Sequence, residues 1–280
     1  MNTATAAAPD TTAAHAPEPA RLSAELATIG VLWRRDLVRF LRQRSRLVGA
    51  LAQPLVFWLI IGGGMASTFN LPTAEGLGYM EYFFPGILVM MVLFAAIFGT
   101  ITVIEDRHEG FLQSVLAGPG SRGALVLGKA AGVSSVGLLQ AATFLIFVPW
   151  AGFQYGAIDW PLLATFLVLG ALGLSAFGFA LAWFIDNSQG YHAIMSILLL
   201  PGWVLSGAMF PVSDKSPALS AIMRGNPMSY LVSGVRRAFY VDAPPLGTTV
   251  GSHLAVDLAV VAGFAVASLS LATWLCYKRR

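Results

Sequence analysis

The sequence of 280 residues contains very little charge and a single cysteine. Only 11% of its residues are Asp, Glu, Lys or Arg, whereas 56% are hydrophobic. A soluble domain averages about 25% charged and about 45–50% apolar residues. So few charges cannot cover the surface of a water-soluble globule of this length, and the apolar excess also excludes a disordered chain. Cys276, the single cysteine, excludes an internal disulfide framework and a multi-cysteine metal site.

The sequence also lacks the residue patterns of most catalytic and nucleotide-binding sites. No nucleophile elbow is present, and acidic residues do not cluster inside the apolar segments. Residues 118–123 spell G-x-G-x-x-G and residues 123–129 spell G-x-x-x-x-G-K, but neither follows a predicted buried strand, and Ala130 stands where a P-loop needs Ser or Thr. We therefore predict a chain that is not an enzyme, holds no cofactor or metal and binds no nucleic acid. The histidines are too scattered to predict a zinc site: His15, His108, His192 and His253.

Long apolar runs make up most of the chain. A helix needs about 20 apolar residues to cross the hydrocarbon core of a bilayer. Residues 1–20 are rich in Ala, Thr and Pro and lack the apolar core of a signal peptide, which predicts a disordered tail before one transmembrane domain of residues 21–280. Apolar runs of sufficient length predict six spans, at about 47–66, 82–104, 130–150, 161–185, 191–210 and 251–277.

Proline and glycine mark two special places in these spans. Pro201 and Gly202 interrupt the fifth span, and a proline inside a helix removes a backbone donor and kinks or breaks the helix. We interpret this pair as a candidate hinge, with a tolerated bend as the alternative. Gly128 and Gly132 are spaced to lie on one helix face, where they favour close contact with another helix.

Basic residues are unevenly distributed between the two sides of the predicted spans. Six spans place both termini on one side, and that side carries most of the Lys and Arg residues. Positively charged segments are retained in the cytoplasm, so we predict a bacterial inner-membrane protein with both termini cytoplasmic. The basic residues on the terminal side are Arg21, Arg34, Arg35, Arg39, Arg42, Arg44, Arg46, Arg107, Arg122, Lys129, Lys278, Arg279 and Arg280, whereas the opposite side carries Lys215, Arg224, Arg236 and Arg237.

An amphipathic segment, residues 21–46, precedes the first span. Its apolar residues recur at helical spacing, and its arginines lie mostly off that stripe. This pattern predicts a helix in the inner membrane interface, close to anionic lipid head groups. Two interpretations remain: a generic membrane anchor, which the sequence favours, or a helix that also contacts a cytoplasmic partner. The stripe consists of Leu22, Leu26, Ile29, Trp33, Leu37 and Phe40.

Two polar segments are predicted to contain short helices that do not span the membrane. In the loop 105–122, an apolar helical face precedes a stop at residues 118–120. We predict that this face binds a groove on another protein, with packing on the membrane surface as the alternative. Residues 226–239 of the outer loop form a helix too short to span, and therefore half-buried or re-entrant. The first face consists of Phe111, Leu112, Val115 and Leu116; the second helix places Tyr230, Leu231, Val235 and Phe239 opposite Arg236 and Arg237.

One isolated acid, Asp257, lies in the sixth span. His253 precedes it by four residues, so the two side chains share a helix face and form a candidate intramembrane polar pair. The alternative, which we favour, is that both lie near the outer interface and are solvated there.

Three groups of residues, in this order along the chain, carry a resemblance to a known family. The groups are Glu105, Arg107, Gly110, Pro119, Ser121, Arg122, Gly128 and Lys129; then residues 205–207 with Phe210 and Pro211; then Asn226, Pro227, Tyr230 and Arg236. Together they resemble the permease subunits of type-2 ATP-binding-cassette (ABC) exporters, which include drug-resistance and lipo-oligosaccharide export permeases. Gly118 departs from the pattern, since many relatives carry a larger apolar residue there, and it is expected to loosen that turn.

The resemblance implies an all-α integral membrane protein with six transmembrane helices, an N-terminal amphipathic interfacial helix, a cytoplasmic coupling helix and an outer re-entrant helix. It also implies a separate ABC ATPase subunit, which would hold ATP and Mg, and a second permease copy, either identical or a close homologue. The substrate pathway would lie between the two permeases. The residues implied in coupling to the ATPase are Glu105, Arg107, Glu109, Gly110, Phe111, Leu112, Ser121 and Arg122.

We therefore predict the permease subunit of an ATP-driven exporter for a hydrophobic or amphiphilic, drug-like substrate. Export of a lipid-linked sugar or polysaccharide is the alternative within the same class. A stand-alone channel or membrane-embedded enzyme, active without an ATPase, is the alternative of another class.

Overall fold

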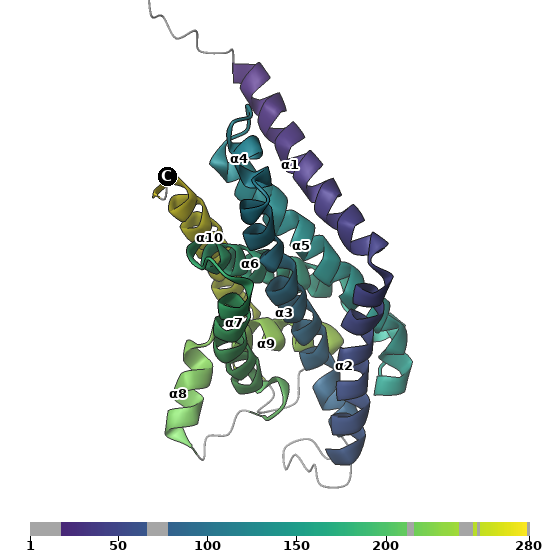
Figure 1. The fold of residues 1–280 in the computed structure, drawn as a ribbon. Coiled ribbons are helices and arrows are strands. Elements are labelled where there is room, and N and C mark those ends of the chain that lie inside the picture. The colour runs from purple at the N-terminus through teal and green to yellow at the C-terminus, as the bar shows by residue number, and fades with distance from the viewer. Residues whose placement is uncertain (1–17, 66–77, 212–215, 241–248, 251–252, 279–280) are drawn as a thin grey trace, which may run out of the picture.

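A computed structural model describes residues 18–65, 78–211, 216–240, 249–250 and 253–278, and these residues form helices and no strand. Residues 1–17 of the predicted tail, as well as Lys215, Arg279 and Arg280, lie outside the described residues, whereas residues 18–20 begin the first helix instead of continuing the tail. In chain order (Figure 1), the α-helices are α1 Glu18–Arg42, α2 Arg44–Met65, α3 Tyr79–His108, α4 Phe111–Leu116, α5 Arg122–Phe144, α6 Trp160–Phe184, α7 Ser188–Trp203, α8 Pro217–Gly225, α9 Pro227–Phe239 and α10 Leu254–Lys278.

Six of the described helices are long and apolar enough to cross a membrane, which confirms the predicted number of spans. The third begins at Arg122, eight residues before the predicted start, because the Ser121 side chain caps it by accepting a hydrogen bond from the Ala124 N–H at 3.1 Å. The described bounds of the six are Val48–Met65, Tyr79–His108, Arg122–Ala151, Trp160–Phe184, Ser188–Ala208 and Leu254–Lys278.

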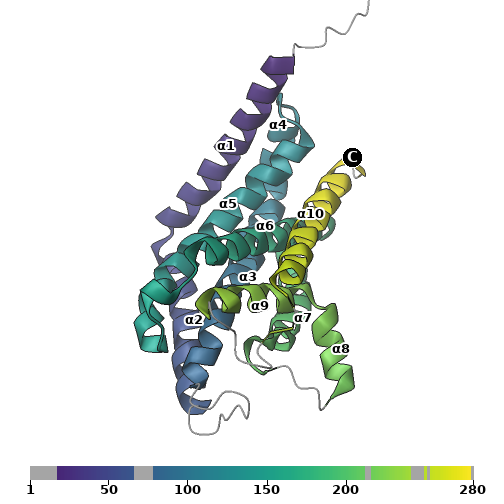
Figure 2. The same ribbon diagram turned by 180° about the vertical axis from the view of Figure 1, so that it is seen from behind.

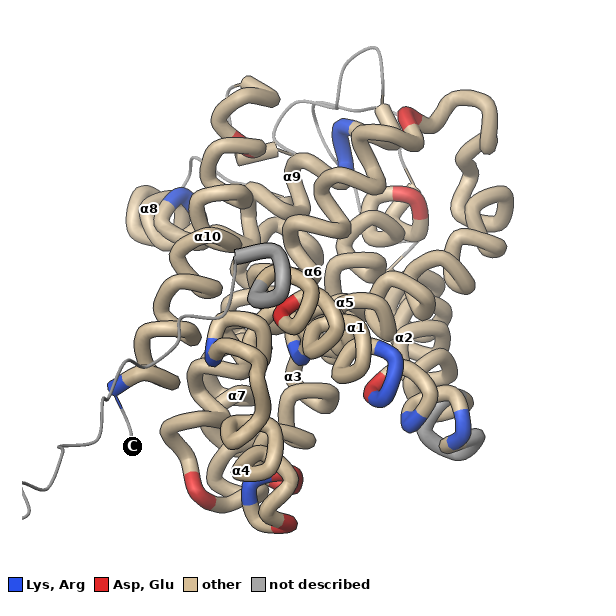
Figure 3. Tube along the Cα trace, turned by 90° about the horizontal axis from the view of Figure 1, so that it is seen from above, with Lys and Arg blue, Asp and Glu red and all other residues tan. Residues whose placement is uncertain are grey.

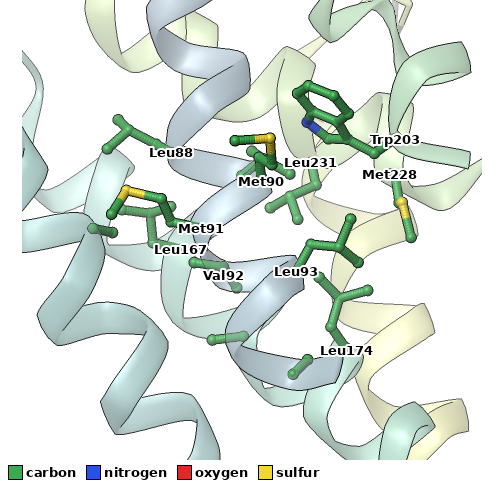
Figure 4. Packing of buried hydrophobic residues seen from close by; sticks show 14 of the residues in the cluster. Leu88, Met90, Met91, Val92, Leu93, Leu167, Leu174, Trp203, Met228 and Leu231 are labelled. Carbon is green, nitrogen blue, oxygen red and sulfur yellow. The ribbon is translucent and has the colours of Figure 1, made fainter. Parts of the chain in front are cut away.

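Helix α3 is the centre of the bundle. It is the most deeply buried of the six spans, and α2, α5, α6, α7 and α9 all pack against it. A continuous apolar stretch of α3 therefore meets apolar side chains from three other helices (Figure 4). The residues labelled there are Leu88, Met90, Met91, Val92 and Leu93 of α3, Leu167 and Leu174 of α6, Trp203 of α7, and Met228 and Leu231 of α9.

Helix α1 packs along α5 over much of its length (Figure 1). Gly128 and Gly132 make this approach possible: a Cβ at Gly128 would lie 3.0 Å from the Leu32 Cβ, and one at Gly132 would lie 3.0 Å from the Asp36 Cβ. The predicted glycine contact is thus confirmed. The buried line on α1 agrees with the predicted stripe at Phe40 but also includes Leu32 and Asp36, whereas Leu22 and Leu26 of the stripe are exposed.

We expect Gly128→Val to detach α1 from α5. The added side chain would overlap both Leu32 and the Ile29 backbone, 3.2 Å from the new Cβ, and overpacking of this kind typically costs about 1–3 kcal/mol. Gly123→Ala is a matched control on the same helix, because its Cβ would meet nothing closer than 3.6 Å. Thermal unfolding of the purified chain in lipid nanodiscs measures both variants; equal midpoints would contradict the close contact.

The fifth span does not break at its proline. Helix α7 continues through Pro201 to Trp203 and then into a π-helical turn, Val204–Ala208, in which Gly207 adopts a left-handed φ of 82°. The departure from helical geometry therefore lies at Gly207, five residues beyond Gly202, because a glycine tolerates positive φ whereas a proline can be accommodated by local adjustment of the helix. The predicted hinge at Pro201 and Gly202 has no break in the described helix to support it.

The described part of the predicted outer loop forms two short helices, α8 and α9, and α9 lies across the bundle (Figure 2). Helix α9 contacts α3, α6, α10 and the π-helical turn, and it is buried on nearly all sides. A Cβ at Gly170 of α6 would come within 2.6 Å of Leu231. The predicted polar face is wrong for Arg236, whose side chain is buried, because backbone carbonyls inside the bundle accept its hydrogen bonds.

Candidate functional site: the α4 end of the bundle

Most residues along the described chain are uncharged (Figure 3). A compact group of charged side chains nevertheless lies where α1, α3 and α5 meet, and most of it is buried. We call Arg35, Asp36, Asp106 and Lys129 the ion cluster. The Asp106 carboxylate is fully buried and accepts two hydrogen bonds from the Arg35 guanidinium, at 2.6 and 2.8 Å. Lys129, only 1% exposed, donates to Asp106 and, at 3.1 Å, to Asp36. Three helices are thereby joined at one point.

The cluster shifts the pKa values of its two α1 residues, Arg35 and Asp36. Hydrogen bonding to Asp106 raises the pKa of Arg35 above its usual value, although burial opposes this. Burial raises the pKa of Asp36, and the neighbouring Lys129 ammonium acts against that increase. Arg39 adds a further contact to Asp106 at 3.4 Å, and the cluster keeps its charges only while these partners are in place, since a buried charge without its partner is costly.

The short helix α4 follows a left-handed glycine. Gly110 has a φ of 75° and turns the chain sharply between α3 and α4. The Arg35 guanidinium lies 3.8 Å from the centre of the Phe111 ring, in a cation–π contact that links α4 to the ion cluster. Glu105, one turn before Gly110, accepts a hydrogen bond from Arg39 at 3.0 Å. Helix α4 is therefore fastened to α1 as well as to its neighbours in sequence.

The apolar face of α4 is partly covered by this chain. Leu112 is buried, and Phe111, Val115 and Leu116 are partly buried against the main core. Helices α3 and α5 cover part of this face, and Phe111, Val115 and Leu116 stay partly exposed, so the binding of this face to a groove on another protein stays a prediction. The side that α4 leaves exposed carries Gln113, Ser114 and the following turn at Ala117–Pro119, with Glu109 before it.

Two arginines fix the ends of the surrounding spans. Arg107 donates to the Trp183 and Ile185 carbonyls, at 2.9 and 2.6 Å, where α6 ends, and it pairs with Asp186. Arg122 donates to the Cys276 carbonyl near the end of α10. Carbonyls at helix ends lack intrahelical partners, so cationic donors stabilise them. Movement of the loop 105–122 would therefore act directly on α1, α3, α5, α6 and α10.

The outer motif forms a second polar assembly at the opposite end. Arg236 donates to the Tyr82 and Gly207 carbonyls, both at 3.2 Å, and its guanidinium lies 4.3 Å from the centre of the Tyr82 ring. The Asn226 amide donates to the Gly202 carbonyl at 2.6 Å, and its oxygen caps α9. Tyr230 donates to the Arg224 carbonyl at 2.8 Å. These bonds support the turn at Gly207 and hold α9 against α3 and α7.

The candidate polar pair in the sixth span is not formed. Asp257 is fully buried and accepts hydrogen bonds from Ser233 at 2.9 Å and Arg237 at 2.8 Å, both on α9. His253 is exposed, and no ion pair or side-chain hydrogen bond joins it to Asp257 among the described residues. The favoured alternative, solvation of both groups, is therefore wrong for Asp257, because α9 supplies its partners.

Sequence reasoning did not find the ion cluster. Lys129 is one of the basic residues of the terminal side, and nothing in the spacing of residues 36, 106 and 129 predicts that they meet. One signal was available: Lys129 lies between two small residues at the start of an apolar run, which is where a charge needs a partner.

Comparison with known proteins identifies relatives over most of the chain. A family model described as ABC-2 type transporter matches residues 27–240. The chain is 25% identical to "Inner membrane transport permease YadH" of Escherichia coli K12 over 227 residues, covering 79% of this chain and 86% of the relative. It is 25% identical to "Nodulation protein J" of Sinorhizobium fredii over 256 residues, covering 89% and 92%. A transport permease named ycf38, from Cyanophora paradoxa, is 27% identical over 210 residues, covering 74% and 72%.

Proposed function

Because the chain belongs to the ABC-2 type transporter family, whose members are the membrane permease subunits of ABC transporters, we propose that it exports a hydrophobic or amphiphilic, drug-like substrate with energy from a separate ATPase subunit. The observation that carries this proposal is the attachment of α4 to three helices through the ion cluster and the Phe111 contact. A displacement of α4 by the ATPase would be transmitted to these helices through direct contacts and not through a flexible loop.

The exposed side of α4 is the proposed contact with the ATPase. ATP and Mg would bind to that partner, and this chain would only transmit the change. A ligand shifts a conformational equilibrium by its differential affinity for the two states, so ATP can drive the permease only through a contact that differs between them. Gln113 and Ser114 are the exposed α4 side chains available for that contact, beside Glu109.

The proposal places the α4 end in the cytoplasm of a bacterial cell, so that both termini face the ATPase and the chain lies in the inner membrane. A second permease copy would complete the transporter. Exposed apolar side chains on α2 and α7 support such a copy, and the Phe57 and Trp203 rings of these two spans lie with their centres 6.3 Å apart. The exposed residues include Val56 and Ile60 of α2, and Ile197 and Leu198 of α7.

The distribution of charge supports an apolar substrate. The charged residues of α3 lie at its ends, with Glu81 in the first turn and Glu105, Asp106 and Arg107 near the last, and its long middle stretch is uncharged. A substrate pathway beside such a helix provides few charged side chains that could bind a charged solute. A screen for substrates that stimulate ATP hydrolysis by the reconstituted complex tests the class; stimulation by lipid-linked sugars alone would replace the drug-like assignment.

We expect Ser114→Trp to weaken assembly with the ATPase by about tenfold or more. The substitution adds bulk to the exposed side of α4 while leaving Phe111 and Leu112 in place, and disruption of a central interface residue can lower affinity by about tenfold or more. Co-purification from cells expressing both subunits, followed by transport-coupled ATP hydrolysis, measures the effect. Gly110→Pro or Phe111→Asp would be less informative, because the first conflicts with the φ of 75° and the second removes internal packing.

Ser270→Trp is the control, because Ser270 is exposed on α10, away from α4. Its complex is expected to match that of the unmodified chain. If the Ser114→Trp chain assembles with the ATPase and couples ATP hydrolysis to transport as the unmodified chain does, the assigned contact surface is wrong. Substrate movement by this chain alone in liposomes would instead support the channel or enzyme alternative.

A further inference from the structure

A cavity of about 300 Å³ lies near the α4 end, enclosed by α1, α2, α3 and α5. Ligand sites in proteins span about 300–1,000 Å³, so this volume suits a small group or part of a larger ligand. Its walls are mainly apolar and aromatic, with Phe94 and Phe98 from α3 and Val136 from α5. The α2 wall includes Gly49 and Gln53, which are exposed, so the cavity can be reached from outside the bundle.

Two carboxamides line this apolar cavity. Gln140 is only 4% exposed, and it forms no hydrogen bond with any described residue; Gln53 on the opposite wall likewise has none within the described chain. The amide atoms of both residues keep access to the cavity, so a ligand there can bind them with donors or acceptors of its own.

A basic groove adjoins the cavity on α1. Arg34, Arg39 and Arg42 line it, and Arg39 lines the cavity as well, so the two are continuous. Arg34 and Arg42 are exposed and pair with no acidic residue in the described part of the chain. Guanidinium groups bind phosphate through paired hydrogen bonds, and this positive charge is therefore available to an anionic head group.

From this continuity we infer that the cavity and groove form one binding site for an anionic phospholipid. The phosphate lies on the α1 arginines, the ester region meets Gln53 and Gln140, and one acyl chain enters between Phe94, Phe98 and Val136. The charged, polar and apolar parts of the lipid thus meet the charged, polar and apolar parts of the site in the same order. The inference does not rest on the proposed export function, because lipid binding requires neither the ATPase nor ATP.

Photocrosslinking of the full chain tests the site. The chain is reconstituted into phosphatidylcholine nanodiscs containing phosphatidylglycerol that carries a diazirine on one acyl chain, and labelled peptides are mapped by mass spectrometry. We expect labelling of α3 residues 94–102 and α5 residues 132–140 to exceed that from phosphatidylcholine carrying the same diazirine. Equal labelling by the two lipids would overturn the preference for an anionic head group.

Matched variants separate this site from general lipid contact. Gly49→Trp fills the cavity mouth, while Gly263→Trp places the same side chain on the exposed face of α10, and neither new Cβ would meet an atom within 4 Å. Gly49→Trp is expected to reduce labelling of the cavity peptides by about tenfold, since a filled cavity excludes the acyl chain, and Gly263→Trp is expected to leave it unchanged. Undiminished labelling in Gly49→Trp would overturn the site.

Two polar variants keep the test decisive if Gly49→Trp folds poorly. Gln140→Leu removes one hydrogen-bonding group and is expected to lower labelling about fivefold. Arg34→Gln combined with Arg42→Gln removes two unpaired charges and is expected to lower the preference for phosphatidylglycerol by about tenfold. Unchanged labelling in both variants would show that neither the amide nor the arginines recognise the lipid.

Discussion

Asp106→Asn is expected to destabilise the folded chain by about 3–5 kcal/mol, the largest effect of any single substitution considered for this protein. The carboxylate is fully buried and is the shared partner of Arg35 and Lys129. Its loss leaves the Lys129 ammonium with Asp36 alone, inside a site that water cannot enter freely. Unfolding of the purified chain in nanodiscs, followed by circular dichroism, measures the change.

Glu105→Gln is the natural control, since this adjacent acid is 38% exposed and pairs with a partly exposed Arg39. Exposed ion pairs contribute about 0–1 kcal/mol, so this variant is expected to remain close to the unmodified chain. Adding Lys129→Met to Asp106→Asn is expected to cost about 0.5–3 kcal/mol less than the sum of the two single changes, because the pair acts as a unit. Additive costs, or equal stability of the two acid variants, would contradict a shared buried cluster.

Asp257→Leu has the second largest expected effect, about 2–4 kcal/mol. Arg237 is only 16% exposed at its side chain, and the substitution removes the carboxylate that accepts its hydrogen bond and that of Ser233. Because these bonds join α10 to α9, limited proteolysis of the outer loop is expected to quicken together with the fall in the unfolding midpoint.

His253→Gln distinguishes this account from the pairing suggested by helical spacing. The imidazole is exposed, and substitutions at such positions usually change stability by less than about 0.5 kcal/mol. If His253→Gln and Asp257→Leu were equally damaging, the histidine would have to support the acid, and the assignment of Arg237 as its partner would fail.

The helical architecture could be predicted because a bilayer constrains a sequence so strongly. Each span must supply about 20 apolar residues, so six runs predicted six helices. The glycines at 128 and 132 were also informative, since their spacing places both on one face and a close helix contact is the main reason for that. These features depend on neighbours within one helix, which a sequence displays directly.

The partners of polar groups could not be predicted in the same way. Helical spacing joined Asp257 to His253, whereas its partners lie on α9, 20 and 24 residues earlier in the chain. The same limitation applies to α4: its apolar spacing was correct, but sequence does not reveal that this chain covers part of the face itself. Pro201 was a similar case, because the helix accommodates the proline and bends its backbone at Gly207.

The close packing of α1 against α5 has a consequence for how the protein is made. Gly128, Gly132 and Lys129, which receive α1, are synthesised about ninety residues after the segment that they contact. Helix α1 therefore lacks its main packing surface while α2 and α3 are being inserted, and Asp106 can pair with Arg35 but has no lysine partner until α5 emerges. Biogenesis must hold the amphipathic helix at the membrane surface during this interval. Completion of α5 is thus the step at which these separately inserted helices can become one compact bundle.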